Sequence, residues 1–173
     1  MKRIMTMVAL AAAALAATSS PASANRDGKS YGGAFCATNQ PAKTTFSFGR
    51  VHHSSDQGVL RLECPIVTDW GRTDSVRVRV ISRNDTVSVN GGRPGVYCSF
   101  EIWSAAEIFA GFSDPRTVAE PFRNAVQELA FGGFPMTSPG YKNLYCKLPP
   151  RRIAGDPQSE SSIVQYEVVE RDD

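Results

Sequence analysis

Histidine and carboxylate side chains set the limits on the chemistry this chain can perform. The two histidines are adjacent, His52 and His53, and Asp56 follows them, so this group is the nearest approach to a metal cluster. On a strand, neighbouring side chains point to opposite faces, so the two imidazoles could chelate one ion only in an irregular turn. They are also the only imidazoles available for acid–base catalysis near neutral pH. We therefore expect no metal and no cofactor.

Patterns typical of hydrolases are weak. No Gly-x-Ser-x-Gly nucleophile elbow occurs in the chain. A glycoside hydrolase needs two carboxylates about 5–10 Å apart in a cleft. Four glutamates could supply them, and none is singled out by its surroundings: Glu101, Glu107, Glu120 and Glu128. No catalytic residue is predicted.

Two aromatic residues form the candidate binding site. In the segment 96–103, apolar residues alternate with Tyr97, Ser99, Glu101 and Trp103, which places Tyr97 and Trp103 on one face of a strand. Such rings could form a flat platform on which the C–H faces of sugars stack. The competing interpretation is structural, because aromatic residues of a sandwich commonly cap the core or lie beneath a loop.

Four cysteines lie in short alternating apolar stretches, at Cys36, Cys64, Cys98 and Cys146. An even count in an exported chain predicts two disulfides, whereas a zinc site would need a close pair such as C-x₂-C. Four cysteines allow three connectivities. Because near neighbours in sequence often pair, we weakly favour Cys36 with Cys64 and Cys98 with Cys146.

The N-terminus reads as a secretory signal. Lys2 and Arg3 precede an apolar run over 4–17, and Ala22-Ser23-Ala24 provides a cleavage site. The run is shorter than the ~20 residues of a membrane-spanning helix. We expect a signal peptide over 1–24, a flexible segment over 25–35 and one sandwich domain over 36–173, in a protein that is secreted or periplasmic.

The charge balance excludes some partners. The signal segment carries two of the 19 Lys and Arg residues and none of the 17 Asp and Glu residues, so the mature chain has no formal net charge. Nucleic-acid binding draws on counterion release by clustered cations, and no such cluster is present. We expect no nucleic-acid partner and no membrane span in the mature chain.

Period-two alternation indicates the elements that must hold these residues. Strands are expected over 44–51 and 59–64, joined as a hairpin by a five-residue loop over 54–58, and over 75–81, 96–103, 142–148 and 163–169. Short strands separated by frequent turns predict an all-β, antiparallel β-sandwich of jelly-roll type.

The segment 105–131 is ambiguous. Val118, Phe122, Val126 and Leu129 recur at helical spacing, which favours a helix over about 117–130. Residues 126–132 also alternate as a strand would. A short helix in the region 105–125 is therefore part of the expected fold.

The order of several motifs resembles a broad family of uncharacterised, exported bacterial β-sandwich proteins. The motifs are Cys64-Pro65, the Val-rich strand 74–80, the Cys98 strand, Cys146-Lys147-Leu148-Pro149 and the closing strand Tyr166-Glu167-Val168-Val169-Glu170. The resemblance implies a strand at 126–131, and it carries no activity. The segment 105–123 is longer here than in that family.

These observations favour a non-enzymatic binding or structural module of the cell envelope or extracellular space, with a glycan or a protein as its partner. One alternative is a carbohydrate-binding module or a glycan-active hydrolase with its site near 105–134. The other is an inhibitor or partner-binding protein that presents the segment 105–123 as a loop.

Overall fold

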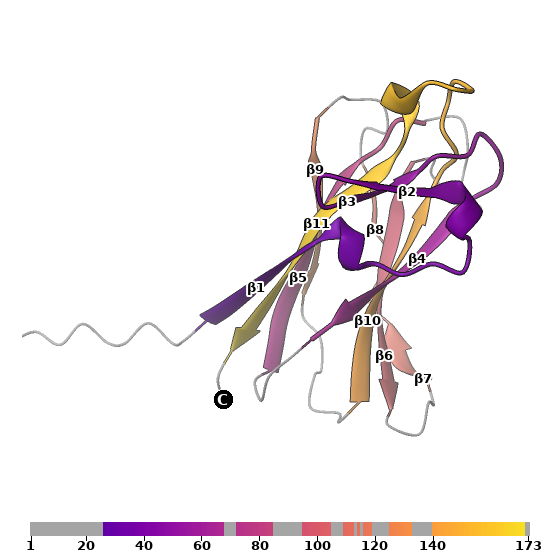
Figure 1. Ribbon diagram of the computed structural model, residues 1–173. Helices are drawn as coiled ribbons and strands as arrows, with labels where there is room; N and C mark the ends of the chain where they lie inside the picture. The colour runs from indigo at the N-terminus through magenta and orange to yellow at the C-terminus, as the bar shows by residue number, and fades with distance from the viewer. Residues whose placement is uncertain are drawn as a thin grey trace, which may run out of the picture.

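Alternating apolar residues fold into two antiparallel sheets that pack face to face in the computed structural model (Figure 1). The structure describes residues 26–67, 72–84, 95–104, 109–112, 114, 116–118, 125–132 and 140–171. Sheet A contains β1 (Arg26–Gly32), β2 (Thr44–Ser47), β3 (Arg50–His53), β5 (Arg72–Ile81), β9 (Gln127–Gly132) and β11 (Ser162–Arg171). Sheet B contains β4 (Leu60–Ile66), β6 (Tyr97–Ser104), β7 (Phe109–Phe112), β8 (Arg116–Thr117) and β10 (Gly140–Leu148). The sequence-based prediction of an all-β sandwich is confirmed.

The core lies between the two sheets because each strand turns its apolar residues inward. In β4, buried residues alternate with exposed ones along the whole strand, and in β5 Val76, Val78 and Val80 are fully buried while Arg77 and Arg79 are exposed. The opposing sheet contributes Phe100 and Leu144 to the same cluster. Each sheet therefore has one buried face and one outer face, and the outer face is available for binding.

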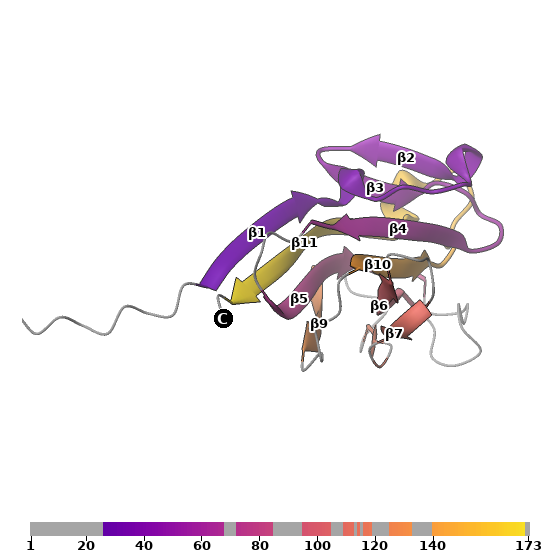
Figure 2. The same ribbon diagram turned by 90° about the horizontal axis from the view of Figure 1, so that it is seen from below.

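Strand β11 organises sheet A. Its first residues pair with β3 and its later residues pair with β1, while its other edge pairs with β5. Figures 1 and 2 show the N-terminal strand lying beside this C-terminal one. The strand order is β2-β3-β11-β5-β9, with β1 attached to β11.

The prediction of a flexible segment over 25–35 is wrong for the described residues. Residues 26–32 pair with β11 over their whole length, and η1 (Gly33–Phe35) follows. Lys29 Nζ lies 2.9 Å from Glu170 Oε2, and the ring of Tyr31 stacks on that of Tyr166. The sandwich therefore begins before Cys36. None of residues 28–32 is fully buried, and Tyr31 is the one large apolar side chain of β1, so the sequence shows no apolar alternation there.

The predicted hairpin over 44–64 is also wrong. The segment 44–51 contains a two-residue turn at Phe48-Gly49, where both residues have positive φ (49° and 73°), and β2 pairs with β3 across it. The loop 54–58 instead carries the chain from β3 in sheet A to β4 in sheet B. Apolar and polar residues alternate on both sides of the turn, so the sequence pattern alone does not show that 44–51 contains two strands.

The described part of 105–125 is strand, not helix. β7 and β8 both pair with β6, and residues 114, 118 and 125 are neither helix nor strand, so the predicted short helix is wrong for these residues; the rest of that prediction lies outside the described residues. β9 covers 127–132 and pairs with β5, as the family resemblance implied. Pairing with neighbouring strands overrides the helical spacing here.

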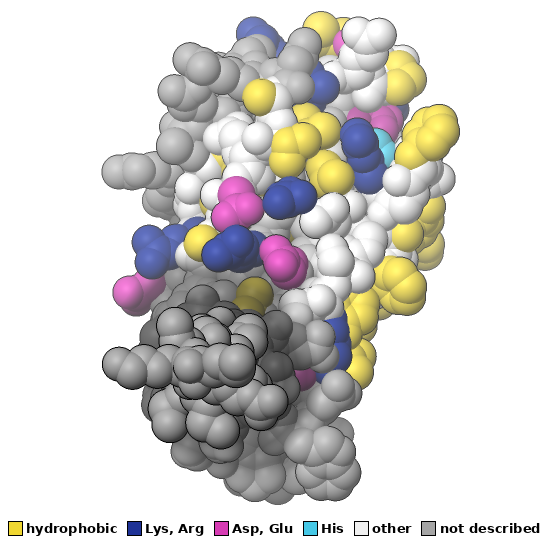
Figure 3. Space-filling view, turned by 90° about the vertical axis from the view of Figure 1, so that its left-hand side faces the viewer, with side chains coloured by type: hydrophobic (Ala, Val, Ile, Leu, Met, Phe, Trp, Pro, Cys, Tyr) yellow, Lys and Arg dark blue, Asp and Glu magenta, His cyan; other side chains and the backbone are white. Residues whose placement is uncertain are grey.

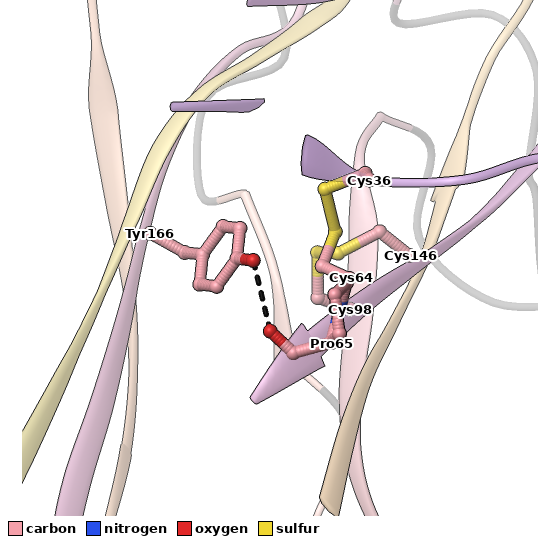
Figure 4. Close-up of a disulfide and its surroundings, with 6 residues drawn as sticks. All are labelled: Cys36, Cys64, Pro65, Cys98, Cys146 and Tyr166. Carbon is pink, nitrogen blue, oxygen red and sulfur yellow. Dashed lines mark hydrogen bonds between the residues drawn. A yellow bond between two sulfur atoms is a disulfide. The ribbon is translucent and has the colours of Figure 1, made fainter. Parts of the chain in front are cut away.

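Two disulfides lie close together at one place in the core (Figure 4). One joins Cys98 to Cys146, which are direct cross-strand partners in β6 and β10. The other joins Cys36, just after η1, to Cys64 of β4. The pairing is the one that sequence proximity favoured. The second bridge fastens the segment that leaves sheet A to the edge of sheet B.

A hydrogen bond also links the two layers. The Tyr166 hydroxyl, on β11, donates to the Pro65 carbonyl oxygen on β4 at 2.9 Å (Figure 4). Burial raises the pKa of this phenol well above its usual value. Tyr166 therefore stays protonated and keeps its donor aimed at sheet B.

Candidate functional site

The outer face of sheet B carries a group of aromatic and charged side chains. Alternation turns Cys98, Phe100 and Ile102 inward on β6, so Tyr97 and Trp103 lie on the opposite face, as predicted. The antiparallel register brings β10 alongside. Four cross-strand pairs result, namely Tyr141 with Trp103, Asn143 with Glu101, Tyr145 with Ser99 and Lys147 with Tyr97.

Trp103 and Tyr141 form a parallel pair at one end of this face. Their ring planes differ by 3° and their centroids are 6.1 Å apart. The indole Nε1 of Trp103 donates to Glu101 Oε2 at 3.2 Å, which restricts the ring's orientation. Tyr141 is 51% exposed. The pair is therefore an aromatic surface that a ligand can reach.

Lys147 organises the other end. Its Nζ lies 5.3 Å from the ring centroid of Tyr97 and 5.7 Å from that of Tyr145, within cation–π range of both. Partial burial, followed by the charge of Arg61, lowers the pKa of Lys147. Burial raises the pKa of Tyr145. Lysine and tyrosine thus hold each other in place over the sheet.

A recess continues this face past β4. Its volume is about 240 Å³, compared with about 340 Å³ for a separate recess on sheet A. Arg61, Glu63 and Tyr145 line it together with the segment 37–39. That segment is held against β4 by paired backbone hydrogen bonds between Ala37 and Glu63, at 2.7 and 2.9 Å. The aromatic face therefore has a wall along one edge.

Tyr97 and Trp103 do not form a single platform. They are six residues apart on β6, about 20 Å at standard strand rise, and each has its own partners on β10. Sequence reasoning missed Tyr141 and Tyr145. The alternation Tyr141-x-Asn143-x-Tyr145-x-Lys147 was present as a signal, but only the strand register places it beside β6.

The histidines lie on opposite faces of β3. His52 points outward, with Nε2 2.9 Å from Ser47 Oγ and Nδ1 3.9 Å from Glu160 Oε2. His53 is fully buried, and its Nδ1 lies 2.8 Å from the Pro149 carbonyl oxygen. Burial lowers the pKa of both imidazoles. Asp56 is exposed in the following turn, and the described residues contain no group of three or more His, Cys, Asp or Glu that could hold a metal ion.

The candidate catalytic carboxylates are not brought together. Glu101 lies on the outer face of sheet B, whereas Glu128 lies on the outer face of sheet A near Arg79, with an N–O distance of 3.7 Å. Glu107 and Glu120 lie outside the described residues. All four cysteines are in disulfides and hence supply no thiol nucleophile. Across the part of the chain that the structure covers, no helix is long and apolar enough to cross a membrane.

Comparison with known proteins gives structural likeness only. The chain matches no protein-family model, and no curated protein is similar to it in sequence. A xylan-binding module, CBM86, from Roseburia intestinalis is 8% identical with a TM-score of 0.47, over 82% of this chain and 94% of that one. A β-1,3-glucan-binding CBM6 from Bacillus halodurans is 16% identical with a TM-score of 0.38, over 84% and 95% of the two chains. A CBM36-1 domain of a xylanase from the hindgut metagenome of Trinervitermes trinervoides is 12% identical with a TM-score of 0.34, over 84% and 96%.

Proposed function

We propose that this protein is an exported, non-enzymatic binding module that holds a neutral glycan chain on the outer face of sheet B. The observation that carries the proposal is the reachable, parallel pair of Trp103 and Tyr141 rings. Aromatic faces carry partial negative charge and attract the polarised C–H groups of sugar rings. A second aromatic group, around Lys147, lies farther along the same strands. The spacing suits a chain rather than a single sugar.

The charges on this face favour a neutral ligand. The two cations Arg61 and Lys147 are equal in number to the two anions Glu63 and Glu101. The uncharged Asn143 and Ser99 lie among them. Such a mixture offers hydrogen-bond donors and acceptors to hydroxyl groups without a field that selects one sign of charge. A polyhydroxylated, uncharged chain fits both features.

The same face does not favour hydrolysis. Glu63 and Glu101 are its two carboxylates with described positions on β4 and β6, and they are two strands and two residues apart. A glycoside hydrolase needs two carboxyl groups in one cleft, whereas the recess that Glu63 lines does not include Glu101. Glu101 also accepts the indole N–H of Trp103, which gives it a positioning role.

Export is part of the proposal. Two disulfides in a chain with a signal-like start favour an oxidising location, either the periplasm or the outside of the cell. The motif order of the exported bacterial β-sandwich family supports the same location. A module in that place meets cell-wall and environmental polysaccharides directly.

Affinity electrophoresis and titration calorimetry on neutral polysaccharides, including xylan and β-1,3-glucan, test the function. We expect at least one to bind, and Trp103→Ala or Tyr141→Ala to weaken that binding about fivefold, since losing a stacking contact costs on the order of 1 kcal/mol. The tryptophan emission should shift on binding in the wild type and not in Trp103→Ala, since the chain has a second tryptophan, Trp70. Phe46→Ala is a matched control, because Phe46 is 56% exposed but lies on β2 of the other sheet.

Two outcomes would overturn the proposal. One is a wild-type protein that binds none of the polysaccharides. The other is equal affinity in the Trp103→Ala and Phe46→Ala variants. Release of reducing sugar by the wild-type protein, abolished by Glu101→Gln, would instead establish a hydrolase.

A further inference from the structure

A second recess lies on the opposite side of the molecule, at one end of the outer face of sheet A. It has a volume of about 340 Å³. Arg50 and His52 of β3, Ile81 and Arg83 at the end of β5, and Ser162 of β11 line it from the sheet. The loop 152–160, with η3 (Pro157–Ser159), lines it from the other side. Figure 3 looks onto this side of the molecule, where blue cationic side chains lie among magenta acidic ones.

The acidic residues of this recess are already engaged. The Asp156 side chain caps η3 by accepting a hydrogen bond from the Gln158 N–H at 2.9 Å. Glu160 lies 3.7 Å from Arg151 Nη1 and 3.9 Å from His52 Nδ1. Burial raises the pKa of Glu160. The carboxylates of Asp156 and Glu160 thus already have partners within the protein.

Two arginines of the recess have no such match. Neither Arg50 nor Arg83 makes an ion pair with a described residue. The Nε of Arg83 is buried, and within the described residues it has no hydrogen-bond partner. A buried donor without an acceptor is destabilising. The guanidinium of Arg83 is thus unbalanced within the described residues, and an anion bound in the recess would balance its charge.

Arginine is suited to one class of ligand. Its planar guanidinium presents N–H donors in a fork that matches the paired oxygens of a carboxylate, sulfate or phosphate. Because Asp156 and Glu160 already have partners, the carboxylates of the lining do not balance the guanidinium charges of Arg50 and Arg83. The recess is also of the size that holds small ligands.

We propose that this arginine recess, defined by Arg50, His52, Arg83 and the loop 152–160, binds an oxyanion group of a small ligand between Arg50 and Arg83. The site lies on the sheet opposite to the aromatic face, so it is independent of the glycan proposal. The shared chemistry is a planar or tetrahedral group with two or more anionic oxygens. A sugar acid or an inorganic oxyanion can supply it.

Nuclear magnetic resonance of ¹⁵N-labelled full-length mature protein tests the proposal directly. Galacturonate, inorganic sulfate and inorganic phosphate are the probes, with galactose and sodium chloride as neutral and ionic controls at matched ionic strength. We expect saturable shifts of the Arg83 Nε–Hε signal and of backbone amides over 152–160 with at least one oxyanion. Arg83→Gln and Arg50→Gln should each weaken binding at least tenfold.

A matched control and a conservative variant sharpen the result. Arg77→Gln removes an arginine from the same sheet face, where Arg77 faces Glu128 outside the recess, and should leave binding unchanged. Arg83→Lys keeps the charge but removes the fork, and should lose part of the affinity. Binding of galacturonate alone assigns the site to sugar acids, and binding of sulfate or phosphate assigns it to the oxyanion itself; both support the proposal. Linear shifts, an equal effect of chloride, or unchanged binding in both Gln variants would overturn it.

Discussion

His53 couples the packing of two sheets to proton binding. Its side chain extends from β3 into the interior, where Nδ1 lies 3.1 Å from the Leu148 carbonyl oxygen and 2.8 Å from that of Pro149, at the end of β10. Both carbonyls are acceptors, so Nδ1 carries the hydrogen. Nε2 is then a bare lone pair, buried and without a partner among the described residues. A second proton there would place a charge with no acceptor inside the protein.

We predict that stability falls as the pH drops below about 6.5. Burial lowers the folded-state pKa of His53 below the usual histidine value of about 6.5, so above that pH His53 is neutral in both states and costs no stability. As the pH falls, the unfolded chain binds the proton first, and stability is lost until the folded-state pKa is reached. Urea unfolding at pH 7.5 and 5.0 measures the loss.

The variant His53→Gln should show a smaller loss between these two pH values than the wild type. His52→Gln is the control, because His52 is only half-buried, although its pKa is lowered in the same direction. Glu160, whose pKa is raised by burial, contributes in the opposite sense as the pH falls further. Identical pH dependence in the wild type and His53→Gln would contradict the assignment.

At the scale of elements, the β2–β3 hairpin turns on an unfavourable residue. Phe48 has φ = 49°, in the left-handed region, and its side chain is 100% exposed. A non-glycine residue there costs about 1–2 kcal/mol, and two-residue turns of this kind favour Asn-Gly. Gly49, the second turn residue, meets the requirement without strain.

Phe48→Asn should therefore stabilise the protein by about 1 kcal/mol, since it relieves the backbone and removes no buried contact. The midpoint of urea unfolding measures the gain. Phe46→Asn, on β2 of the same hairpin, has no strain to relieve and should be neutral or destabilising. A Phe48→Asn variant no more stable than the wild type would refute this account of the turn.

The elements that could be predicted from sequence are those whose pattern is local. Strand β5 alternates valine with arginine because one face is buried and one is wet, and β6, β10 and β11 follow the same rule. Strand β1 could not be found in this way, since it exists through its partner β11. The Phe48 turn lacks the Asn-Gly signal, so two short strands read as one.

Only part of the candidate binding face could be predicted from the sequence, for a related reason. Alternation along β6 placed Tyr97 and Trp103 on one side, but the identity of the neighbouring strand is long-range information. Tyr141 enters the site only because residue 141 pairs with residue 103. The arginine recess is assembled from β3, β5, β11 and a loop, and no local pattern links them.

Over the whole molecule, covalent bonds and packing share the task of joining the layers. The Cys98–Cys146 bridge lies within sheet B, and the Cys36–Cys64 bridge ties the N-terminal segment to it. Between the sheets themselves, the contacts include the apolar core and hydrogen bonds from Tyr166 to the Pro65 carbonyl, from His53 to the Leu148 carbonyl and from Lys142 to Thr73. Both bridges close chain loops, of 28 and 48 residues in sequence separation.

Replacing either pair of cysteines with alanine should cost about 2–4 kcal/mol of unfolding free energy, with the longer loop costing only about 0.5 kcal/mol more in the chain-entropy model. Chemical unfolding of the two double variants measures this. Mass spectrometry before and after reduction provides the control, since each bridge adds two hydrogens when it opens. Free thiols at all four positions of the purified protein would contradict the structure.

Strand β11 has a consequence for the timing of folding. Among the described strands it is the last to leave the ribosome, yet β1, β3 and β5 all pair with it. When a chain is synthesised from its N-terminus, these three strands therefore lack their common pairing partner until residues 162–171 have been made. Sheet A closes late, by contacts between distant parts of the chain. Until β11 is available, β1, β3 and β5 lack the strand that joins them into one sheet.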